Sequence, residues 1–205
     1  MIYDITRPLQ NGMPFYPGDT KPVFSLLDSG DFQITQMSIC SHTGTHIDAP
    51  AHYIKNGTPI DQIAINVMCG PCRVLDIREC GSVISPKDIS NLESNDKRLI
   101  IKTGYNGETF DPSYPGLSPE AADYLVKSGI CCLGIDTPSI EPFHGDGTVH
   151  RRLFLAGIPI IENLDLSQVT AGTYILLALP LLLTDGDGSP CRAVLLDNKK
   201  NGGIE

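Results

Sequence analysis

Residues 41–53 read SHTGTHIDAPAHY, and this short stretch holds three of the five histidines of the 205-residue chain. Its glycine, threonine and proline residues favour an extended or turning backbone over a helix. Successive side chains of an extended segment point to opposite faces, so the side chains at the even positions share one face. That face carries His42, His46, Asp48 and His52. The stretch is therefore predicted to be a strand with turns that gathers metal-binding side chains.

Chain geometry limits which of these side chains can share one cation. A fully extended chain would separate the first and last of the three histidines by about 33 Å, whereas His46 and Asp48 would lie about 6.6 Å apart. His42 can join this pair only through a bend, which Gly44 permits, and Pro50 supplies a second corner before the last histidine. The sequence thus predicts two bends around a central strand.

The residue types indicate a particular chemistry. Neutral imidazole combined with carboxylate suits Zn²⁺, Mn²⁺ or Fe²⁺, and three protein ligands leave a position open for water. Such a cation lowers the pKa of bound water to about 7 and polarises a carbonyl group. A histidine just outside the ligand set can carry the proton that hydrolysis moves, and His52 lies beyond the second corner. The simpler interpretation is that all four are ordinary polar residues near a turn.

The bulk composition fits one globular protein domain. A typical domain holds about 100–200 residues, so residues 1–205, 41% of them hydrophobic, are expected to form a single domain, with 198–205 a flexible tail. The formal net charge of −9, without any basic run, argues against a nucleic-acid partner. Seven scattered cysteines favour reduced thiols and therefore a cytoplasmic protein.

No stretch of the sequence predicts insertion into a membrane. The N-terminal MIYDITRPL lacks the basic start and apolar centre of a secretory signal. The longest apolar run, YILLALPLLL at residues 174–183, contains a proline and is too short to span a bilayer, which needs about 20 residues. This run is instead predicted to be buried core.

Short apolar runs, rich in branched residues and bounded by Gly, Pro, Asp or Asn, predict six strands at 72–77, 98–103, 130–136, 158–161, 173–179 and 191–197. A helix is predicted at 118–128, between two of these strands, with Ser118 as its N-cap and Gly129 as its C-terminal stop. A second Ser-Pro pair, Ser85–Pro86, predicts another helix start. The expected fold is a mixed α/β domain with a strongly curved or barrel-like sheet and a few peripheral helices.

The pattern His-x-Gly-Thr-His-x-Asp-x-Pro-x-His in this stretch resembles the signature of the metal-dependent cyclase family, which includes bacterial kynurenine formamidases and isatin hydrolases. Further landmarks resemble the family in the expected order, so the resemblance covers nearly the whole chain. They are YPGD at 16–19, KTG at 102–104, GIDTPSIE at 134–141, His150 with ENL at 162–164, and DGSPCRAV at 187–194. The resemblance implies a swivelling β/β/α domain that assembles into a homo-oligomer, either a dimer or a tetramer.

The resemblance also implies roles for individual residues. Five positions match metal ligands of the family's formamidases: His42, His46, Asp48, His150 and Glu162. The match to Asp48 bridges two ions, although members with one ion exist, so one or two divalent transition metal ions per subunit are expected, Zn²⁺ first and Mn²⁺ second. His52 matches the proton donor or acceptor. Tyr16 stands where these formamidases carry a tryptophan that lines the substrate pocket, and it is the candidate substrate-binding residue.

These features together predict a metal-dependent hydrolase of a small-molecule amide, acting on a carbon–nitrogen bond other than a peptide bond. An arylformamide is the first expectation, as in kynurenine formamidase. Metal-activated water would attack, and His52 would serve as general acid and base. An ester hydrolase, a lactam hydrolase or a ring-closing cyclase on the same site is the alternative within this class.

Two alternatives belong to other classes of protein. The CGPC stretch, Cys69–Cys72, has the spacing of thioredoxin-like redox sites and would suit a thiol–disulfide oxidoreductase. The RVLDI that comes directly after it, however, predicts a strand instead of the helix that such sites need. A metal-binding module without catalytic activity is the other alternative. His144, between glycine-rich neighbours, could contact substrate or simply be exposed.

Overall fold

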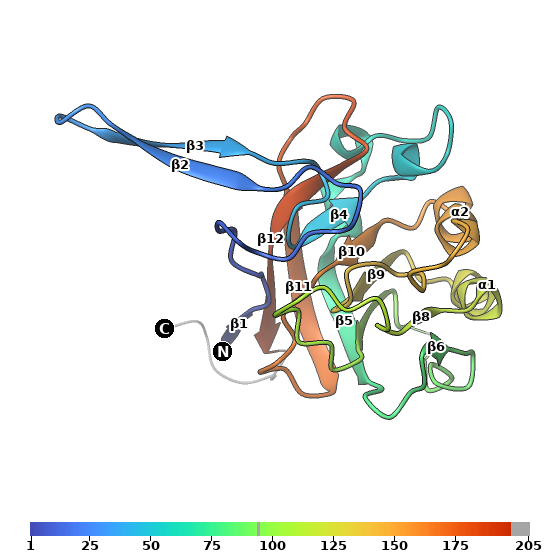
Figure 1. Ribbon diagram of the computed structural model, residues 1–205. Coiled ribbons are helices and arrows are strands. Elements are labelled where there is room, and N and C mark those ends of the chain that lie inside the picture. The colour runs from blue at the N-terminus through green and yellow to red at the C-terminus, as the bar shows by residue number, and fades with distance from the viewer. Residues whose placement is uncertain (94, 198–205) are drawn as a thin grey trace.

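The computed structural model describes residues 1–93 and 95–197, so the predicted tail at 198–205 lies outside the described residues. An eight-stranded sheet curves around the centre of the molecule (Figure 1). Its order is β1 (Ile2–Asp4), β12 (Gly188–Asp197), β11 (Gly172–Pro180), β5 (Cys69–Asp76), β7 (Arg98–Lys102), β9 (Cys132–Ile135), β10 (Ile160–Glu162) and β4 (His46–Asp48). Because β4 also pairs with β12, the strands from β12 to β4 close into a ring, and β1 extends it along β12.

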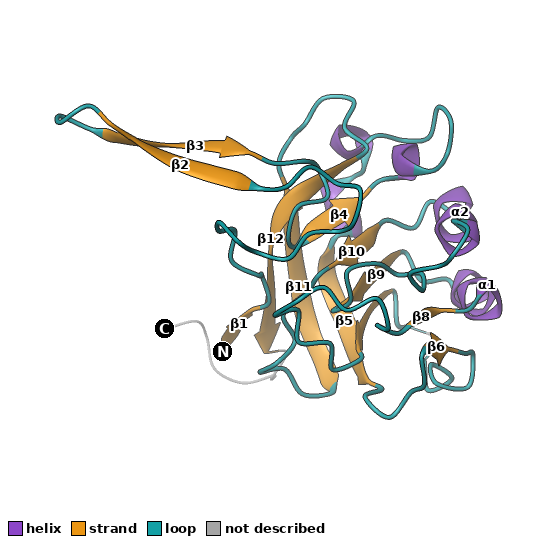
Figure 2. Cartoon of the chain, viewed as in Figure 1, coloured by secondary structure: helices purple, strands orange, loops and turns teal. Residues whose placement is uncertain are grey.

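The described residues form two α-helices, and both serve as crossover connections. Strands β5, β7, β9 and β10 run parallel to one another, and parallel strands need such connections. Helix α1 (Pro119–Ser128) joins β7 to β9, and α2 (Thr148–Leu155) joins β9 to β10. Figure 2 shows both helices on the same side of the barrel. The predicted class, a mixed α/β fold with a barrel-like sheet and peripheral helices, is confirmed.

Shorter elements complete the described chain. Strands β6 (Val83–Ile84) and β8 (Gly116–Leu117) form a small parallel pair, and β2 (Val23–Asp28) and β3 (Gln33–Ser38) form an antiparallel hairpin. Three single turns of 3₁₀ helix lie at η1 (Pro50–His52), η2 (Ile60–Gln62) and η3 (Ile65–Val67). Neither described α-helix is long and apolar enough to cross a membrane.

The predicted elements correspond closely to observed ones. Each of the six predicted strands overlaps one of β5, β7, β9, β10, β11 and β12. Helix α1 begins at Pro119, one residue after the predicted start, and ends at the predicted Ser128, with the N-cap and the C-terminal stop at the predicted residues. The Ser118 side chain accepts a hydrogen bond from the Ala121 N–H at 3.2 Å, and Gly129 adopts a left-handed φ of 74°.

The helix predicted after Ser85–Pro86 is wrong, because this segment forms a turn. The Asp88 carboxylate accepts hydrogen bonds from the Ser85 N–H at 2.8 Å and from the Ser85 hydroxyl at 2.7 Å. The bond to the Ser85 N–H is one half of the reciprocal arrangement of a helix start, but the next residues are Ile, Ser and Asn. Such residues lose side-chain freedom in a helix or compete for backbone hydrogen bonds, so the first turn does not propagate.

The prediction that residues 174–183 are entirely buried is also wrong in part. Leu176 and Ala178 of β11 are buried in the barrel interior, as predicted. Beyond Pro180 the chain leaves the sheet, and Leu181 is 57% exposed and Leu182 83% exposed. Strand alternation therefore holds only to the end of β11, and the apolar residues beyond it lie on the surface.

Two apolar clusters pack against opposite faces of the same sheet. Along β7, Ile100 belongs to the cluster inside the barrel, while Leu99 and Ile101 belong to the cluster beneath the helices. This alternation is what a strand buried on both faces requires. The single-domain expectation stays a prediction, and it is supported by this sheet shared between the two clusters.

The hairpin of β2 and β3 departs from the compact body. It extends away from the barrel as a two-stranded ribbon (Figure 1), and its side chains are exposed apart from the half-buried Phe24. An isolated hairpin is at best marginally stable in water. Apolar side chains of this ribbon, such as Leu27 and Ile34, are exposed and would be stabilised by packing against another surface.

A close backbone contact behind the histidine stretch gives the first testable prediction. A Cβ added to Gly57 would lie 2.6 Å from the carbonyl carbon of Pro50, so the turn that carries His52 would have to shift. We expect Gly57→Ala to lower the free energy of unfolding by more than about 1 kcal/mol in urea denaturation. Gly81→Ala is the control, because a Cβ there meets open space, and its effect should stay within about 0.5 kcal/mol. Equal stability of the two variants would contradict this packing.

Candidate metal centre

Strand pairing builds the centre around β4. The register between β10 and β4 sets Glu162 opposite His46, and residues directly opposite each other in a ladder share a face. Asp48 lies two residues beyond His46 and therefore on that same face, as the sequence alternation predicts. Both edges of β4 are paired, one with β10 and the other with β12. The two carboxylates and the imidazole thus have fixed positions relative to one another.

The bend predicted at Gly44 brings the preceding histidine back to the strand. Gly44 has a left-handed φ of 65°, which a residue with a side chain rarely adopts. The bend places His42 Nδ1 2.7 Å from Asp48 Oδ1. Its ring centroid lies 5.0 Å from that of His46.

His150 joins the centre from helix α2, more than a hundred residues along the chain. Its Nε2 lies 3.8 Å from Asp48 Oδ2 and 3.4 Å from Glu162 Oε1. His46 Nε2 lies 3.1 Å from the other oxygen of Asp48 and 3.6 Å from the other oxygen of Glu162. Two groups of three ligand atoms result, each within 4.8 Å of one another: His42, His46 and Asp48, and Asp48, His150 and Glu162. Asp48 belongs to both.

Each imidazole in these groups donates from its outer nitrogen to an oxygen that can only accept. The bonds run from His46 Nδ1 to the Gly44 carbonyl at 2.8 Å, from His150 Nδ1 to Glu141 Oε2 at 2.6 Å, and from His42 Nε2 to Asp187 Oδ2 at 3.0 Å. Each outer nitrogen therefore carries a hydrogen, and the inner nitrogen faces the carboxylates, where either a second proton or a cation can bind. Metal-ligating histidines in proteins are held in this way.

The electrostatics of the centre call for positive charge. Asp48 and Glu162 are almost completely buried, and an unpaired buried carboxylate is strongly unfavourable. Burial disfavours a charged imidazole at His42, but hydrogen bonds to Asp187 and Asp48 outweigh it and raise its pKa to about 11. Burial likewise opposes protonation of His150, yet the Glu141 hydrogen bond and the Glu162 carboxylate raise its pKa to about 9. Protons thus take the place that a cation would fill.

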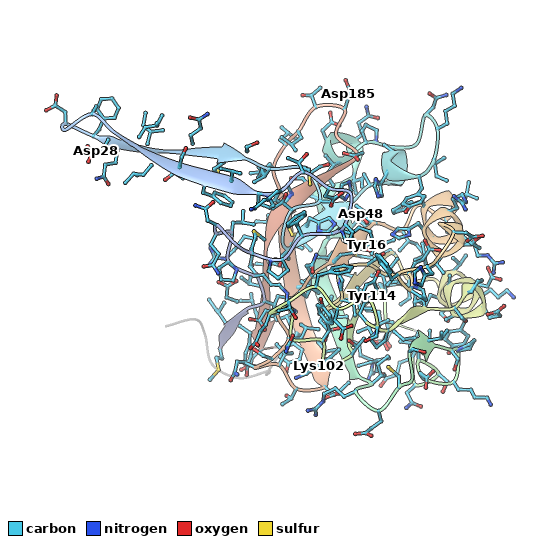
Figure 3. The ribbon with its side chains drawn as sticks, viewed as in Figure 1. Tyr16, Asp28, Asp48, Lys102, Tyr114 and Asp185 are labelled. Carbon is cyan, nitrogen blue, oxygen red and sulfur yellow. The ribbon has the colours of Figure 1, made fainter. Side chains whose placement is uncertain are left out.

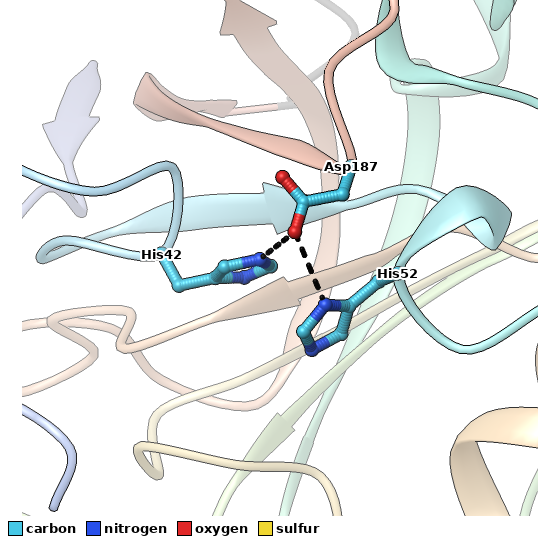
Figure 4. Close-up of side chains that lie close together, drawn as sticks. All are labelled: His42, His52 and Asp187. Carbon is cyan, nitrogen blue, oxygen red and sulfur yellow. Dashed lines mark hydrogen bonds and ion pairs between the residues drawn. The ribbon is translucent and has the colours of Figure 1, made fainter. Parts of the chain in front are cut away.

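His52 lies beside this centre but outside both groups. The 3₁₀ turn that begins at Pro50 carries it, and its ring centroid is 4.0 Å from that of His42. Figure 4 shows its Nδ1 directed at the Asp187 carboxylate, 3.3 Å from Oδ2. Burial lowers the pKa of His52, so the ring is neutral at pH 7. His42, His52 and Asp187 form a third group whose atoms could hold a cation.

A cavity of about 110 Å³ opens onto the centre, and Tyr16, His52 and His150 are among its lining residues. Figure 3 labels Tyr16 and Asp48, which line the same cavity. The Tyr16 ring packs against two phenylalanines, with centroid distances of 5.6 Å to Phe110 and 5.8 Å to Phe143. Phe15 and Tyr53 also line the cavity, so its lining includes three aromatic side chains besides the histidines.

The cysteine pair lies away from this cavity and lacks the features of a redox site. Cys69 and Cys72 belong to strand β5, and side chains three positions apart on a strand point to opposite faces. Burial raises the pKa of the Cys72 thiol to about 12, so it is not a thiolate at neutral pH. The geometry thus disfavours the oxidoreductase alternative. His144 is exposed and is not a lining residue of the cavity.

Sequence reasoning did not assign two residues that hold the imidazoles, Glu141 and Asp187. Both lie within stretches that resemble family landmarks, GIDTPSIE and DGSPCRAV. Glu141 comes after a buried strand, which gave a weak signal. Asp187 shares its loop with Asp185, and nothing in the sequence distinguishes the aspartate that faces the histidines from the one that does not.

Comparisons with known proteins agree with this geometry. Residues 3–142 match the family described as Putative cyclase. A kynurenine formamidase of Bacillus cereus is 38% identical over 200 residues, covering 94% of this chain and 95% of its own. A kynurenine formamidase of Bacillus anthracis is 36% identical over the same length and coverage.

Solved structures show the same fold. A potential metal-dependent hydrolase with cyclase activity superposes with a TM-score of 0.87 at 32% identity, covering 95% of this chain and 96% of its own. An isatin hydrolase bound to thioisatinate superposes with a TM-score of 0.84 at 21% identity, covering 97% of this chain and 92% of its own, which is a likeness of fold. From the family match and the identity along nearly its whole length, the chain belongs to the Putative cyclase family.

Proposed function

We propose that the chain is a metal-dependent hydrolase of a small-molecule amide, with an arylformamide as the substrate class. The observation that carries this proposal is the pair of three-residue groups that share Asp48, with His52 beside them and outside both. The similarity to kynurenine formamidases supports the substrate class. The bond cleaved would be a carbon–nitrogen bond other than a peptide bond.

The donor set fits a divalent transition metal. Imidazole nitrogens and carboxylate oxygens are the ligands that Zn²⁺ and Mn²⁺ take in proteins, and the outer nitrogens here are already held. We propose that Zn²⁺ binds first and that Mn²⁺ can replace it. His42, His46 and Asp48 would hold one ion, and Asp48, His150 and Glu162 would hold a second. When bound, such an ion supplies an acidified water molecule and draws charge from the substrate carbonyl.

His52 would transfer the proton in this reaction. A ring that is neutral at pH 7 can accept a proton, and burial lowers the pKa of His52. Its Nδ1 faces Asp187, so the free lone pair lies on Nε2. That nitrogen can take a proton from water and return it to the leaving nitrogen of the amide.

Tyr16 would bind the aryl part of the substrate. Its ring lines the cavity with Phe15 and Tyr53, and it packs against Phe110 and Phe143. Aromatic rings pack favourably against one another in edge-to-face or offset arrangements. A flat aryl group would lie against these rings, with its amide carbonyl directed toward the ion that Asp48 and Glu162 would hold.

We also propose that the chain acts as a homo-oligomer, a dimer or tetramer, in the cytoplasm. All seven cysteines are free thiols, as in proteins of a reducing compartment. Hairpin residues Leu26, Leu27, Ile34 and Met37 are all more than half exposed. Leu27 and Ile34 lie on one face of the ribbon and Leu26 and Met37 on the other, and exposed apolar surface commonly marks a protein–protein contact. A second copy of the chain would cover it.

Two histidine substitutions test the proposed division of roles. We expect His52→Ala to retain bound metal and lose turnover by about 10²- to 10⁴-fold, because a general acid–base group contributes that much. His46→Ala should lose both metal and turnover. Metal analysis beside a formamidase assay measures the two quantities. Near-normal turnover of the His52 variant would contradict its role, and full activity after chelation would contradict the metal.

The pKa shifts predict how metal changes the pH dependence of stability. The raised pKa values of about 11 for His42 and 9 for His150 mean that their stabilisation of the metal-free fold is full below pH 6.5 and declines above it. The lowered pKa of Asp48 means that its stabilisation is full above pH 3.8 and is lost in acid. The metal-free protein should thus be most stable between these two values.

Metal binding should remove the decline above pH 6.5, because the bound imidazoles no longer carry the extra proton. Thermal melting from pH 5 to 9, with chelator and with added zinc, measures the difference. Turnover of the loaded enzyme should fall below about pH 6, where protons compete with metal. Parallel melting curves in the two states would be inconsistent with protons and metal sharing these ligands.

The hairpin of β2 and β3 should form the contact between subunits of the proposed homo-oligomer. Leu27 and Ile34 are directly opposite each other on the ribbon, so aspartate at both positions puts two charges on one face. We expect Leu27→Asp with Ile34→Asp to reduce the mass in analytical ultracentrifugation, because charges cannot be buried in the contact. Leu155→Asp, an exposed leucine on α2, is the control. If the double variant keeps the mass of the wild type, the hairpin does not form the contact.

A further inference from the structure

The carboxylate of Asp187 lies between two imidazoles that the proposed reaction uses in different ways (Figure 4). Its Oδ2 is 3.0 Å from His42 Nε2 and 3.3 Å from His52 Nδ1. Its Oδ1 accepts a hydrogen bond from the Ser41 hydroxyl at 2.8 Å. One carboxylate therefore contacts a candidate metal ligand, the candidate proton-transfer residue and a hydroxyl that holds it in place.

The backbone fixes this carboxylate relative to β4. The Asp187 carbonyl accepts a hydrogen bond from the Ala49 N–H at 2.9 Å. Gly188, the next residue, pairs with Asp48 where β12 meets β4. The pairing of β12 with β4 therefore fixes the position of Asp187 relative to Asp48.

We propose that Asp187 is a positioning residue that fixes the hydrogen on the outer nitrogen of both imidazoles. A carboxylate only accepts, so His42 would keep the hydrogen on Nε2, toward Asp187, when a bound ion takes the place of the proton on Nδ1. His52 keeps its hydrogen on Nδ1, which leaves the lone pair of Nε2 free to accept a proton. The inference rests on the proposed function only for the use of these two nitrogens.

The competing interpretation makes His42, His52 and Asp187 a metal site of their own. It would require His42 to bind through Nε2, which would leave Nδ1 turned away from that ion, 2.7 Å from Asp48. The Asp187 side chain is also 46% exposed, whereas Asp48 and Glu162 are buried. His46 and His150 are each held at the outer nitrogen by an oxygen, and Asp187 gives His42 the same support.

The test uses full-length zinc-loaded protein and three variants. Asp187→Ala removes the acceptor, and Asp187→Leu removes it while keeping similar volume, should the alanine variant not fold. Asp187→Asn removes the charge but retains one carbonyl oxygen that can accept. Asp185→Asn is the matched control, with the same change in charge two residues away and no contact to an imidazole. Nitrogen-15 shifts of the His52 ring at pH 7.5, assigned with His52→Ala, report which nitrogen carries the hydrogen.

In wild-type protein and in the control, we expect His52 to carry its hydrogen on Nδ1. Asp187→Ala or Asp187→Leu should redistribute the hydrogen between the two nitrogens and lower kcat by about 10- to 100-fold, with metal retained. Asp187→Asn should keep the wild-type shifts and most of the turnover. A residue that only supports the loop would change the melting temperature without changing the shifts.

Two results would overturn the proposal. One is unchanged His52 shifts in a folded variant that lacks the acceptor. The other is loss of one zinc ion from both Asp187→Ala and His52→Ala, which would make these residues ligands. Absence of formamidase turnover in the wild type would count against the proposed function alone, because the nitrogen shifts need no substrate.

Discussion

The pairing of β4 along both of its edges is the constraint on which the rest of the molecule depends. This strand of three residues closes the barrel by joining β10 to β12, and it carries two of the candidate ligands. The β10 ladder brings Glu162 alongside it, and the β12 ladder brings Asp187. Barrel closure and site assembly are therefore one event, and a shift of register by one residue would turn His46 and Asp48 to the other face.

Burial gives this geometry its chemical consequence. Asp48, Glu162 and Glu141 all have little contact with water, so their charge must be balanced inside the protein. In the metal-free chain, protonated imidazoles supply that balance, as the raised pKa values of His42 and His150 indicate. Divalent cations can supply it more fully while leaving the imidazoles neutral. The protons that stabilise the metal-free fold therefore compete with metal for the same imidazole nitrogens.

Much of the fold and part of the site can be predicted from local sequence rules. Alternation places His46 and Asp48 on one face, Gly44 permits the bend before them, and Ser118 and Gly129 set the ends of α1. These rules act over a few residues, which is why one sequence suffices to apply them. Helix α2 was not predicted, because its N-cap is Gly147, which offers no side-chain cap. A local signal can also mislead. The Ser-Pro pair at Ser85 starts a turn instead of a helix because of the residues after it, and Leu182 is exposed because the chain leaves the sheet after Pro180.

The contacts that were not predicted join residues distant in sequence. Asp187 meets His42 across 145 positions, and nothing near it in the chain marks it apart from Asp185. Glu141 meets His150 only because α2 comes after a particular loop. These contacts depend on how the sheet closes. Sequence rules that act over a few residues therefore do not predict them. The resemblance to a known family located the ligands, and the structure identified the residues that hold them.

The central claim is that Asp48 joins two cation sites within one closed barrel. Crystals of zinc-loaded protein, measured on both sides of the zinc absorption edge, test this most directly. We predict two anomalous peaks per chain, one among His42, His46 and Asp48 and one among Asp48, His150 and Glu162. Zinc peaks that avoid Asp48, or a fully loaded crystal with zinc only between His52 and Asp187, would contradict it.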